Sequence, residues 1–286
     1  MLVTNNPLVS VIMASFNHAE YVVDAINSVV NQTYKNIELI VIDDGSTDGT
    51  SEKIAELAEI HGFIFIQQEN IGYQNTLKKL VALATGEYIS PFASDDIYEL
   101  IKIEKLVRVM ESNPSYAVVH SKICIIDSYG AIQKIVNEPC RSGKVFRELL
   151  RADFHINGIS ALVKTDVYRG VKRYDDYVDD LPIWLEIAKQ HEIGYYDEVT
   201  ARYRIHNNHL TSNRSKMMKS ELEVVARYKD LPYYREAEAA WRMRWFLSLS
   251  GANKRDAINL LFSSGFNLNI LRTKTFYKGI YTLMFR

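Results

Sequence analysis

Short apolar runs that alternate with amphipathic segments limit the fold of the first hundred residues more than any other feature of this chain. Residues 9–14 (VSVIMA) form one such run, and a second run ends just before Asp43. Runs rich in β-branched residues are typical of strands buried on both faces of a sheet. The β-α-β-α order predicts an α/β fold with a mostly parallel sheet and helices on both faces. Strands are expected at 9–14, 37–42, 63–66 and 87–90, and helices at 21–30, in the segment before Gly62, and at 76–84.

The pattern becomes less regular after Pro114. We expect strands at 116–126 and 132–136, a further strand candidate at 157–164 and a helix at 183–189. From about residue 213 the pattern is helical and carries long charged stretches. The chain is therefore expected to have a sheet-bearing domain of residues 1–212 and a helical C-terminal extension of residues 213–286.

The composition excludes several classes of protein. The formal net charge of the 286 residues is -1, which argues against nucleic acid as a partner. The two cysteines, Cys124 and Cys140, are too few for a disulfide framework or a cysteine zinc site, so a reducing cytoplasm fits best. The apolar run at 9–14 is too short for a signal peptide or a membrane span.

Polar side chains follow three of the expected parallel strands. In open α/β sheets, ligands bind beyond the carboxyl ends of the strands, so these clusters are expected to converge on one edge. Taken singly, each has an ordinary alternative: Asp-Asp-Gly-Ser is often only a tight turn, and an isolated Asp-Asp is often a solvated loop or a helix cap. The clusters are Ser15-Phe16-Asn17, Asp43-Asp44 and Ser94-Asp95-Asp96.

The chain lacks the glycine-rich loops that bind phosphate by backbone N–H groups. It contains neither G-x-G-x-x-G nor G-x-x-x-x-G-K-[ST], so dinucleotide-binding and P-loop functions have no support. A divalent cation held by carboxylates can neutralise a diphosphate instead, and paired aspartates suit Mg²⁺ or Mn²⁺.

These segments, taken together, resemble the family-two glycosyltransferases of the GT-A fold, a Rossmann-like α/β fold. The resemblance spans roughly residues 8–210 and keeps the order and spacing of the motifs. The blocks that carry it are VSVI with Ser15-Phe16-Asn17, VNQTY at 30–34, IVIDDGSTDGT at 40–50, Glu69-Asn70-Ile71-Gly72, TGEYI at 85–89, and Ser94-Asp95-Asp96.

The resemblance implies roles for residues of the nucleotide-sugar site. Phe16 would stack on a uracil ring, and Asp44, with Asp43 beside it, would accept a hydrogen bond from the base. Asp95 would mainly contact ribose and Asp96 mainly the metal ion, although the two could exchange roles. Ala93 departs from the common Asp-x-Asp form of this loop, which bears on metal affinity and donor identity. The remaining residues that match the nucleotide-sugar site are Ser15, Asn17, Asn70, Gly72 and Ser94.

The catalytic base is expected in the acidic pair Asp179-Asp180, which precedes a Trp-containing segment, as in the family's Glu-Asp motif. As an acceptor hydroxyl attacks the anomeric carbon, a positioned carboxylate must take its proton. The resemblance favours Asp180 as the base, with Asp179 close behind. An alternative is that both residues cap the helix that opens near Pro182.

His206 resembles a family position at which histidine meets the metal ion or the diphosphate, although a lone histidine is more often structural. His209 is a weaker candidate, and Arg204 either approaches phosphate or is solvated. The other histidines singled out, which we expect to be structural, are His18, His120, His155 and His191.

The C-terminus combines basic and aromatic residues, and no acidic residue follows Asp256. Phe276, Ile280 and Leu283 fall on one helical face, with Lys274 and Lys278 on the other. A basic and aromatic helix suits an anionic membrane interface. Packing on the rest of the protein, or a homodimer contact, is the equal alternative.

The resemblance implies an inverting glycosyltransferase that uses Mn²⁺ or Mg²⁺. It would move a sugar from a nucleoside diphosphate sugar, with UDP preferred, to a hydroxyl of a glycan or lipid-linked glycan in surface polysaccharide biosynthesis. The expected location is the cytoplasm, with peripheral contact to the inner face of the plasma membrane as an option. A catalytically silent GT-A-like binding module is the alternative. A nucleotidyltransferase is disfavoured because the loop after residue 14 lacks glycine and basic residues.

Overall fold

The computed structural model describes residues 6–173, 180–206, 213–262 and 274–285, which divide into two compact units. The first unit comprises the chain up to Val145 together with 156–173 and 186–206. The second comprises 146–155, 174–185 and 207–286. The second unit therefore includes two segments that precede the boundary at 212 expected from the helical pattern.

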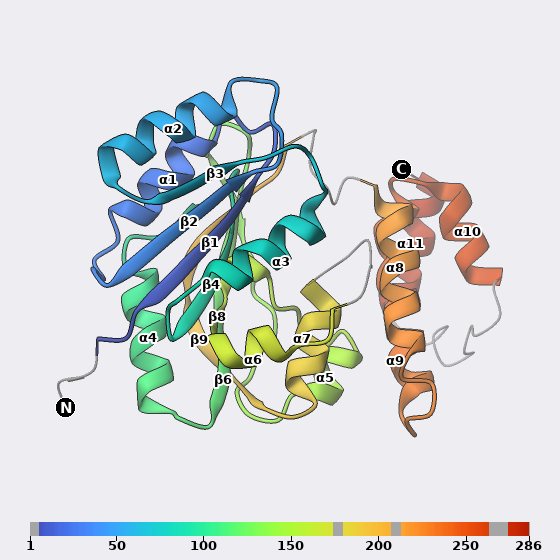
Figure 1. The fold of residues 1–286 in the computed structure, drawn as a ribbon. Coiled ribbons are helices and arrows are strands. Elements are labelled where there is room, and N and C mark those ends of the chain that lie inside the picture. Colours follow the sequence, from blue (N-terminus) through green and yellow to red (C-terminus); the bar gives the residue numbers. More distant parts are fainter. Residues whose placement is uncertain (1–5, 174–179, 207–212, 263–273, 286) are drawn as a thin grey trace. The chain divides into compact units, whose positions relative to one another are not determined.

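The first unit is built on a mixed sheet in which the described strands follow the order β3-β2-β1-β4-β8-β6-β9-β5, with β7 paired to β6 (Figure 1). The four strands at the β3 side are parallel to one another, and Ser15 at the end of β1 lies beside Asp43 at the end of β2. The carboxyl ends of these strands therefore meet at one edge of the sheet. These strands are β1 (Val9–Ser15), β2 (Ile37–Asp43), β3 (Ile64–Gln67) and β4 (Tyr88–Ala93).

The other half of the sheet is mixed. Strand β8 (Leu162–Lys164) runs antiparallel to both β4 and β6 (Tyr116–Ile126). The longest strand, β9 (Glu192–Arg204), runs parallel to β6 and antiparallel to β5 (Ile97–Tyr98). Strand β7 (Ile132–Ile135) forms a hairpin with β6.

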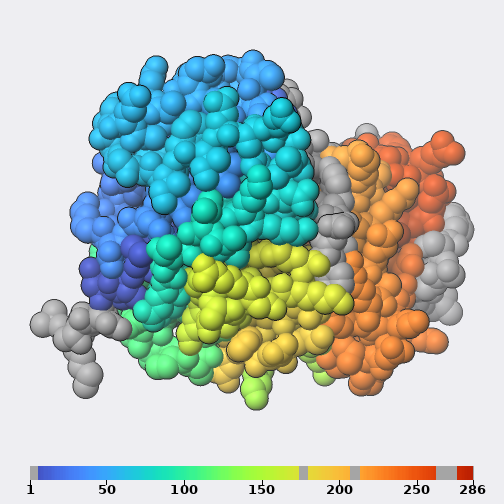
Figure 2. Space-filling view, in the orientation of Figure 1, coloured from blue at the N-terminus to red at the C-terminus, as the bar shows by residue number. Residues whose placement is uncertain are grey.

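Helices cover both faces of the parallel half because alternate strand residues face opposite layers. Val9, Val11 and Met13 belong to a core cluster that also contains residues of α1, α2 and α4. No residue of α3 belongs to this cluster, although α3 contacts β1 and β2. Figure 2 shows the side chains of α2 (blue) and α3 (teal) on one face of the molecule. The helices are α1 (Val22–Val30), α2 (Thr50–His61), α3 (Tyr73–Leu83), α4 (Lys102–Ser112) and α6 (Thr165–Gly170).

The expected α/β architecture is confirmed, with two local corrections. The candidate strand at 157–164 is instead a short 3-10 helix, Gly158–Ser160, followed by β8, since Asn157 caps the helix by accepting the Ile159 N–H. The sequence also gave no indication of β9, whose residues include acidic side chains and Gly194.

The second unit is helical in its described residues. Trp241 is buried in it and donates its indole N–H to Leu150 O. On α11, Gly279 lies against the Phe246 ring of α9, and Phe276 stacks on the same ring. Among the described residues no helix is long and apolar enough to span a membrane. Its helices are α5 (Phe146–Leu150), the start of α7 (Asp180–Ala188), α8 (Arg214–Ala226), α9 (Tyr234–Ser250), α10 (Lys254–Phe262) and α11 (Lys274–Phe285).

Candidate functional site

The loop after β1 is fixed to the loop after β2 by hydrogen bonds between backbone N–H groups and side-chain oxygens. Asn17 adopts a left-handed conformation with φ of 54°, which its short polar side chain tolerates. Its N–H donates to Ser46 Oγ at 2.8 Å, and its Oδ1 accepts the Thr47 N–H at 2.9 Å. Ser15 is buried, with no hydrogen-bond partner for its Oγ among the described residues, whereas the Phe16 side chain is 46% exposed. The loop therefore presents one aromatic ring on a fixed backbone.

Asp43 and Asp44 hold the second loop in different ways. Asp43 is buried and accepts both the N–H and the hydroxyl of Ser46. Asp44 accepts the N–H groups of Ile71 and Gly72, both at 3.0 Å, and the side-chain amide of Gln68 at 2.8 Å. Burial alone would raise the pKa of Asp44, but these donors hold that pKa below its ordinary value. Asp44 is thus an ionised anchor for the segment after β3.

The segment after β3 approaches the Asp43-Asp44 turn closely. Gly45 has φ of +81°, and a Cβ added there would lie 2.8 Å from the Asn70 backbone N. Asn70 Oδ1 in turn accepts the Gly72 N–H at 3.2 Å. The glycine is required both by its backbone conformation and by this contact.

The third loop carries Asp95 and Asp96 in two different environments. Asp96 is buried; its Oδ1 accepts the Arg204 N–H at 2.7 Å, and its Oδ2 has no hydrogen-bond partner among the described residues. Burial, reinforced by the neighbouring Asp95, raises the pKa of Asp96 well above its ordinary value. Asp95 instead turns its Oδ2 toward two histidines.

Arg204, at the end of β9, is buried beneath this loop. Its Nε donates to Asp95 O at 2.7 Å, and its Nη1 donates to Asp127 O and Ser128 O. The guanidinium also lies over the Tyr21 ring, 4.8 Å from its centroid. The sequence left phosphate contact or solvation open for Arg204, and the structure makes it a buried support of the Asp95 backbone.

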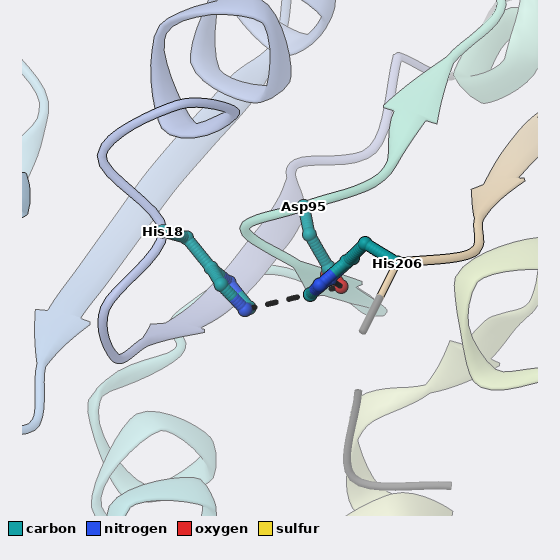
Figure 3. A group of neighbouring side chains, drawn as sticks. All are labelled: His18, Asp95 and His206. Atoms are coloured by element: carbon teal, nitrogen blue, oxygen red, sulfur yellow. Dashed lines mark hydrogen bonds and ion pairs between the residues drawn. The ribbon is translucent and has the colours of Figure 1, made fainter. Parts of the chain in front are cut away.

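His18, Asp95 and His206 form the only group of three or more potential metal-ligating side chains found among the described residues (Figure 3). His206 Nε2 lies 2.9 Å from Asp95 Oδ2, and His18 Nε2 lies 3.9 Å from the same oxygen. Their ligand atoms all lie within 4.8 Å of one another. Burial lowers the pKa of His18 despite the nearby Asp95 carboxylate, which favours the neutral imidazole, the form that can bind a metal ion. Two imidazoles and a carboxylate are donors that suit a divalent transition-metal ion.

His18 is the residue that sequence reasoning left out of the site. The available signal was its position directly after Asn17 in the loop after β1. Side chains beyond the carboxyl end of a parallel strand lie at the ligand-binding edge of the sheet, and this applies to His18 as much as to Asn17. Of the other histidines, His120 is buried in β6, where burial lowers its pKa to about 3, and His155 lies against the Trp241 ring. His209 lies outside the described residues.

The expected catalytic base falls at a helix start. Asp180 is the first residue of α7 and is half-buried, whereas Asp179 lies outside the described residues. Asp180 belongs to the second unit and the Asp95 loop to the first. The α7 helix continues through Pro182 to Ala188, so a Pro in its first turn is accommodated as expected.

Comparison with known proteins identifies the chain. A family model described as glycosyl transferase family 2 matches residues 10–171, more than half of the 286 residues. The chain belongs to glycosyl transferase family 2. This family-2 glycosyltransferase is 27% identical over 240 residues to TuaG of Bacillus subtilis, named as a candidate glycosyltransferase of teichuronic acid biosynthesis; the match covers 82% of this chain and 92% of that protein.

Two solved structures share the fold of the family-2 glycosyltransferase. Staphylococcus aureus TarS 1–349, in complex with UDP-GlcNAc, superposes with a TM-score of 0.71 at 15% identity, covering 96% of this chain and 89% of that chain. The mannosyltransferase PcManGT from Pyrobaculum calidifontis, in complex with GDP-Man and Mn²⁺, gives 0.62 at 16% identity, covering 99% and 88%. The expected GT-A fold and glycosyltransferase class are confirmed.

Proposed function

We propose that this glycosyltransferase moves a sugar from a nucleoside diphosphate sugar, with UDP as the nucleotide, to a hydroxyl of a glycan or lipid-linked glycan. The observation that carries the proposal is the meeting of the loops after β1 and β4 at one sheet edge, where His18 and Asp95 lie beside His206. The UDP-GlcNAc complex of TarS supports the choice of nucleotide, and the name of TuaG supports an acceptor in a surface polymer.

The base and ribose would lie over the first two loops. Phe16 offers an exposed ring for stacking on uracil. The Asp44 carboxylate, which the protein's donors keep ionised, would accept an N–H of the base. Asn70 and Gly72 then act by shaping the segment that Asp44 holds.

Asp95 and His206 would hold the divalent ion, Mn²⁺ or Mg²⁺, because their ligand atoms already face each other. When bound, the ion supplies positive charge that stabilises the diphosphate leaving group. Asp96 would act differently, since its Oδ1 is occupied by the Arg204 N–H inside the protein. We therefore move the metal role from Asp96 to Asp95 and propose that Asp96 fixes the loop.

Asp180 would take the proton of the acceptor hydroxyl as its oxygen attacks the anomeric carbon from the face opposite the diphosphate. This attack inverts the anomeric configuration. The half-buried carboxylate at the start of α7 remains an acceptor-side candidate, and Asp179 is the second choice.

The test is a panel of UDP-, GDP- and dTDP-sugars incubated with the protein and Mn²⁺, scored for release of free nucleotide. We expect slow hydrolysis of one UDP-sugar without acceptor, its loss in EDTA, and its return with added Mn²⁺. Binding of a donor without any release, with or without candidate acceptors, would favour the silent binding module instead. Release that persists in EDTA would remove the metal ion from the proposal.

The same proposal includes contact with an anionic membrane through α11. Phe276, Ile280 and Leu283 are half-buried, and Phe276 stacks on Phe246 of α9, so this apolar face packs on the protein. The outer face carries exposed Lys278 and no acidic side chain, since none follows Asp256 in the chain. Aromatic and basic residues on one helix face suit the headgroup region of a bilayer. The outer apolar residues are Tyr277, Tyr281, Met284 and Phe285.

Flotation with vesicles tests this contact. The protein should float with phosphatidylglycerol-containing vesicles and less with phosphatidylcholine alone, and the double variant Tyr277→Ser/Tyr281→Ser should lose binding. Tyr129→Ser, at a tyrosine 95% exposed in the first unit, is the matched control. Equal flotation of the double variant would contradict the membrane contact. A dimer of the wild type that is lost in the double variant would assign the face to packing between copies.

A further inference from the structure

His18 lies beside Asp95 and His206, the two residues proposed to hold the metal ion, but the proposed function gives it no role of its own. It belongs to the loop after β1, whereas Asp95 follows β4 and His206 follows β9. Its Nε2 points toward Asp95 Oδ2, and its ring stands at 90° to the His206 ring with centroids 5.5 Å apart (Figure 3). Three separate elements therefore bring one potential ligand each to the same point.

The His18 ring is oriented by its neighbours. Its Nδ1 lies 2.8 Å from Ser94 Oγ, and Ser94 is fully buried. A partner on one ring nitrogen fixes both the tautomer and the orientation of a histidine ligand, leaving the other nitrogen for the ion. Here the remaining nitrogen is Nε2, the atom that faces Asp95.

The backbone that carries the ring is also fixed. The His18 N–H donates to Thr50 Oγ1 at 2.9 Å, and the next N–H, from Ala19, donates to Asp48 Oδ2 at 3.0 Å. Before it, Asn17 holds the left-handed conformation that turns the chain. A side chain fixed at both its backbone and its ring keeps its donor atom in place with little ordering cost.

The separations of the three donors fit one ion. With metal–ligand bonds of about 2.1 Å, two ligands of one ion lie at most about 4.2 Å apart. Asp95 Oδ2 lies 2.9 Å from His206 Nε2 and 3.9 Å from His18 Nε2, and all three ligand atoms lie within 4.8 Å of one another. A side-chain adjustment of less than about 1 Å brings all three into range.

We propose that His18 is a third protein ligand of the metal ion, and that the resulting site of two imidazoles and one carboxylate selects Mn²⁺, Co²⁺ or Zn²⁺ over Mg²⁺. This inference deepens the metal site of the proposed function. Imidazole nitrogen suits first-row transition ions, whereas Mg²⁺ favours oxygen ligands and retains its waters. Three protein ligands leave further positions of the ion open to the oxygens of a diphosphate.

Pulsed EPR of the Mn²⁺-loaded protein tests the ligand set directly, because coordinated imidazole nitrogens modulate the signal. Two imidazoles are expected in the wild type and one in His18→Gln. His61→Gln, at an exposed histidine at the end of α2, is the matched control and should keep two. One imidazole in the wild type, or an unchanged signal in His18→Gln, would overturn the proposal.

Competition binding measures the selectivity. In His18→Gln the affinity for Co²⁺ should fall at least about 10-fold, while the affinity for Mg²⁺ changes little. His18→Asp, which places an oxygen ligand at this position, should bind Mn²⁺ but show a smaller preference for Co²⁺ over Mg²⁺. This variant also tests the selectivity if His18→Gln does not fold. An equal loss for Co²⁺ and Mg²⁺ in both variants would contradict the selectivity.

The outcomes separate this inference from the proposed function. Transfer of sugar by a protein whose Mn²⁺ signal shows one imidazole would leave the function standing and remove His18 from the site. Two imidazoles in a protein that releases no nucleotide from any donor would keep His18 as a metal ligand and contradict the proposed function.

Discussion

His206 Nε2 lies 2.9 Å from Asp95 Oδ2, although 111 residues separate the two in the chain. The sheet brings them together, since β9 ends at Arg204, two residues before His206, and the Arg204 N–H donates to Asp96. The Arg204 guanidinium meanwhile holds Asp95 O from below. The end of β9 and the loop after β4 thus form one rigid support, on which the two ligand atoms face each other.

Asp95→Asn and Asp96→Asn should have different effects on metal binding. Asp95→Asn removes the charged oxygen that faces both histidines, so Mn²⁺ affinity and sugar transfer should each fall, the latter by roughly 100-fold or more, since a metal ion supplies several kcal/mol of charge stabilisation. Asp96→Asn keeps an oxygen for the Arg204 N–H and should retain most of the Mn²⁺ affinity. Isothermal titration with Mn²⁺ and initial-rate assays check both, and the opposite order of effects would restore Asp96 as the metal ligand.

Asp180→Asn should abolish most of the turnover while donor binding survives. The amide cannot accept the proton of the acceptor hydroxyl, and a positioned base typically contributes about 10²–10⁴-fold. Steady-state rates and a UDP-sugar titration measured on the same preparation separate the two quantities. Asp179→Asn is the comparison variant: full activity in Asp180→Asn with loss in Asp179→Asn would move the base by one residue, and full activity in both would remove it from this pair.

The parallel half of the fold could be predicted because each of its strands is a short apolar run and each helix has an amphipathic face. The location of the site at one edge of the sheet could also be predicted, because the topology places Asn17, Asp44 and Asp95 just after the ends of parallel strands. Strand β9 could not be predicted in this way, since its half-buried positions are occupied by residues such as Tyr195 and Tyr196 interleaved with acidic ones. It is held by β6 along most of its length, a long-range pairing that local pattern does not encode.

Within the site, residue types were easier to predict than their orientations. From the sequence, His206 and mainly Asp96 were expected at the metal ion, and Asp95 mainly at the ribose. Adjacent aspartates look alike in a sequence, and only the backbone decides that Asp96 turns inward to the Arg204 N–H. His18 was missed because a lone histidine carries no periodic signal. Its partner Ser94 is 76 residues away.

Gly45→Ala should destabilise the protein more than Gly49→Ala. Both glycines have positive φ, which costs an alanine about 1–2 kcal/mol. A Cβ at Gly49 meets nothing within 4 Å, whereas one at Gly45 lies 2.8 Å from the Asn70 backbone N, which cannot retreat without moving the N–H groups that hold Asp44. Thermal unfolding should rank the two variants, and UDP affinity should fall only in Gly45→Ala. Equal melting temperatures and equal UDP affinities would show that the segment after β3 can move to accommodate the added methyl group.

Glu221→Gln should stabilise the second unit above pH 7 and have little effect near pH 5. Glu221 accepts the Trp245 indole N–H at 2.6 Å, and its burial between α8 and α9 raises its pKa from 4.5 to about 7, against the opposing effects of that hydrogen bond and of Arg244. Between pH 4.5 and 7 the folded state therefore binds more protons than the unfolded state, so stability falls as pH rises through this range and is then constant. Glutamine stays neutral and still accepts the indole N–H.

The melting temperature of Glu221→Gln should accordingly exceed that of the wild type by a few degrees at pH 8, the difference shrinking toward zero at pH 5. Glu223→Gln is the matched control, because Glu223 lies on the same helix with an exposed side chain, and its melting temperature should follow the wild type at both pH values. If Glu221→Gln melts below the wild type at pH 8, the carboxylate is stabilised in its charged form, and the pairing with Arg244 outweighs burial.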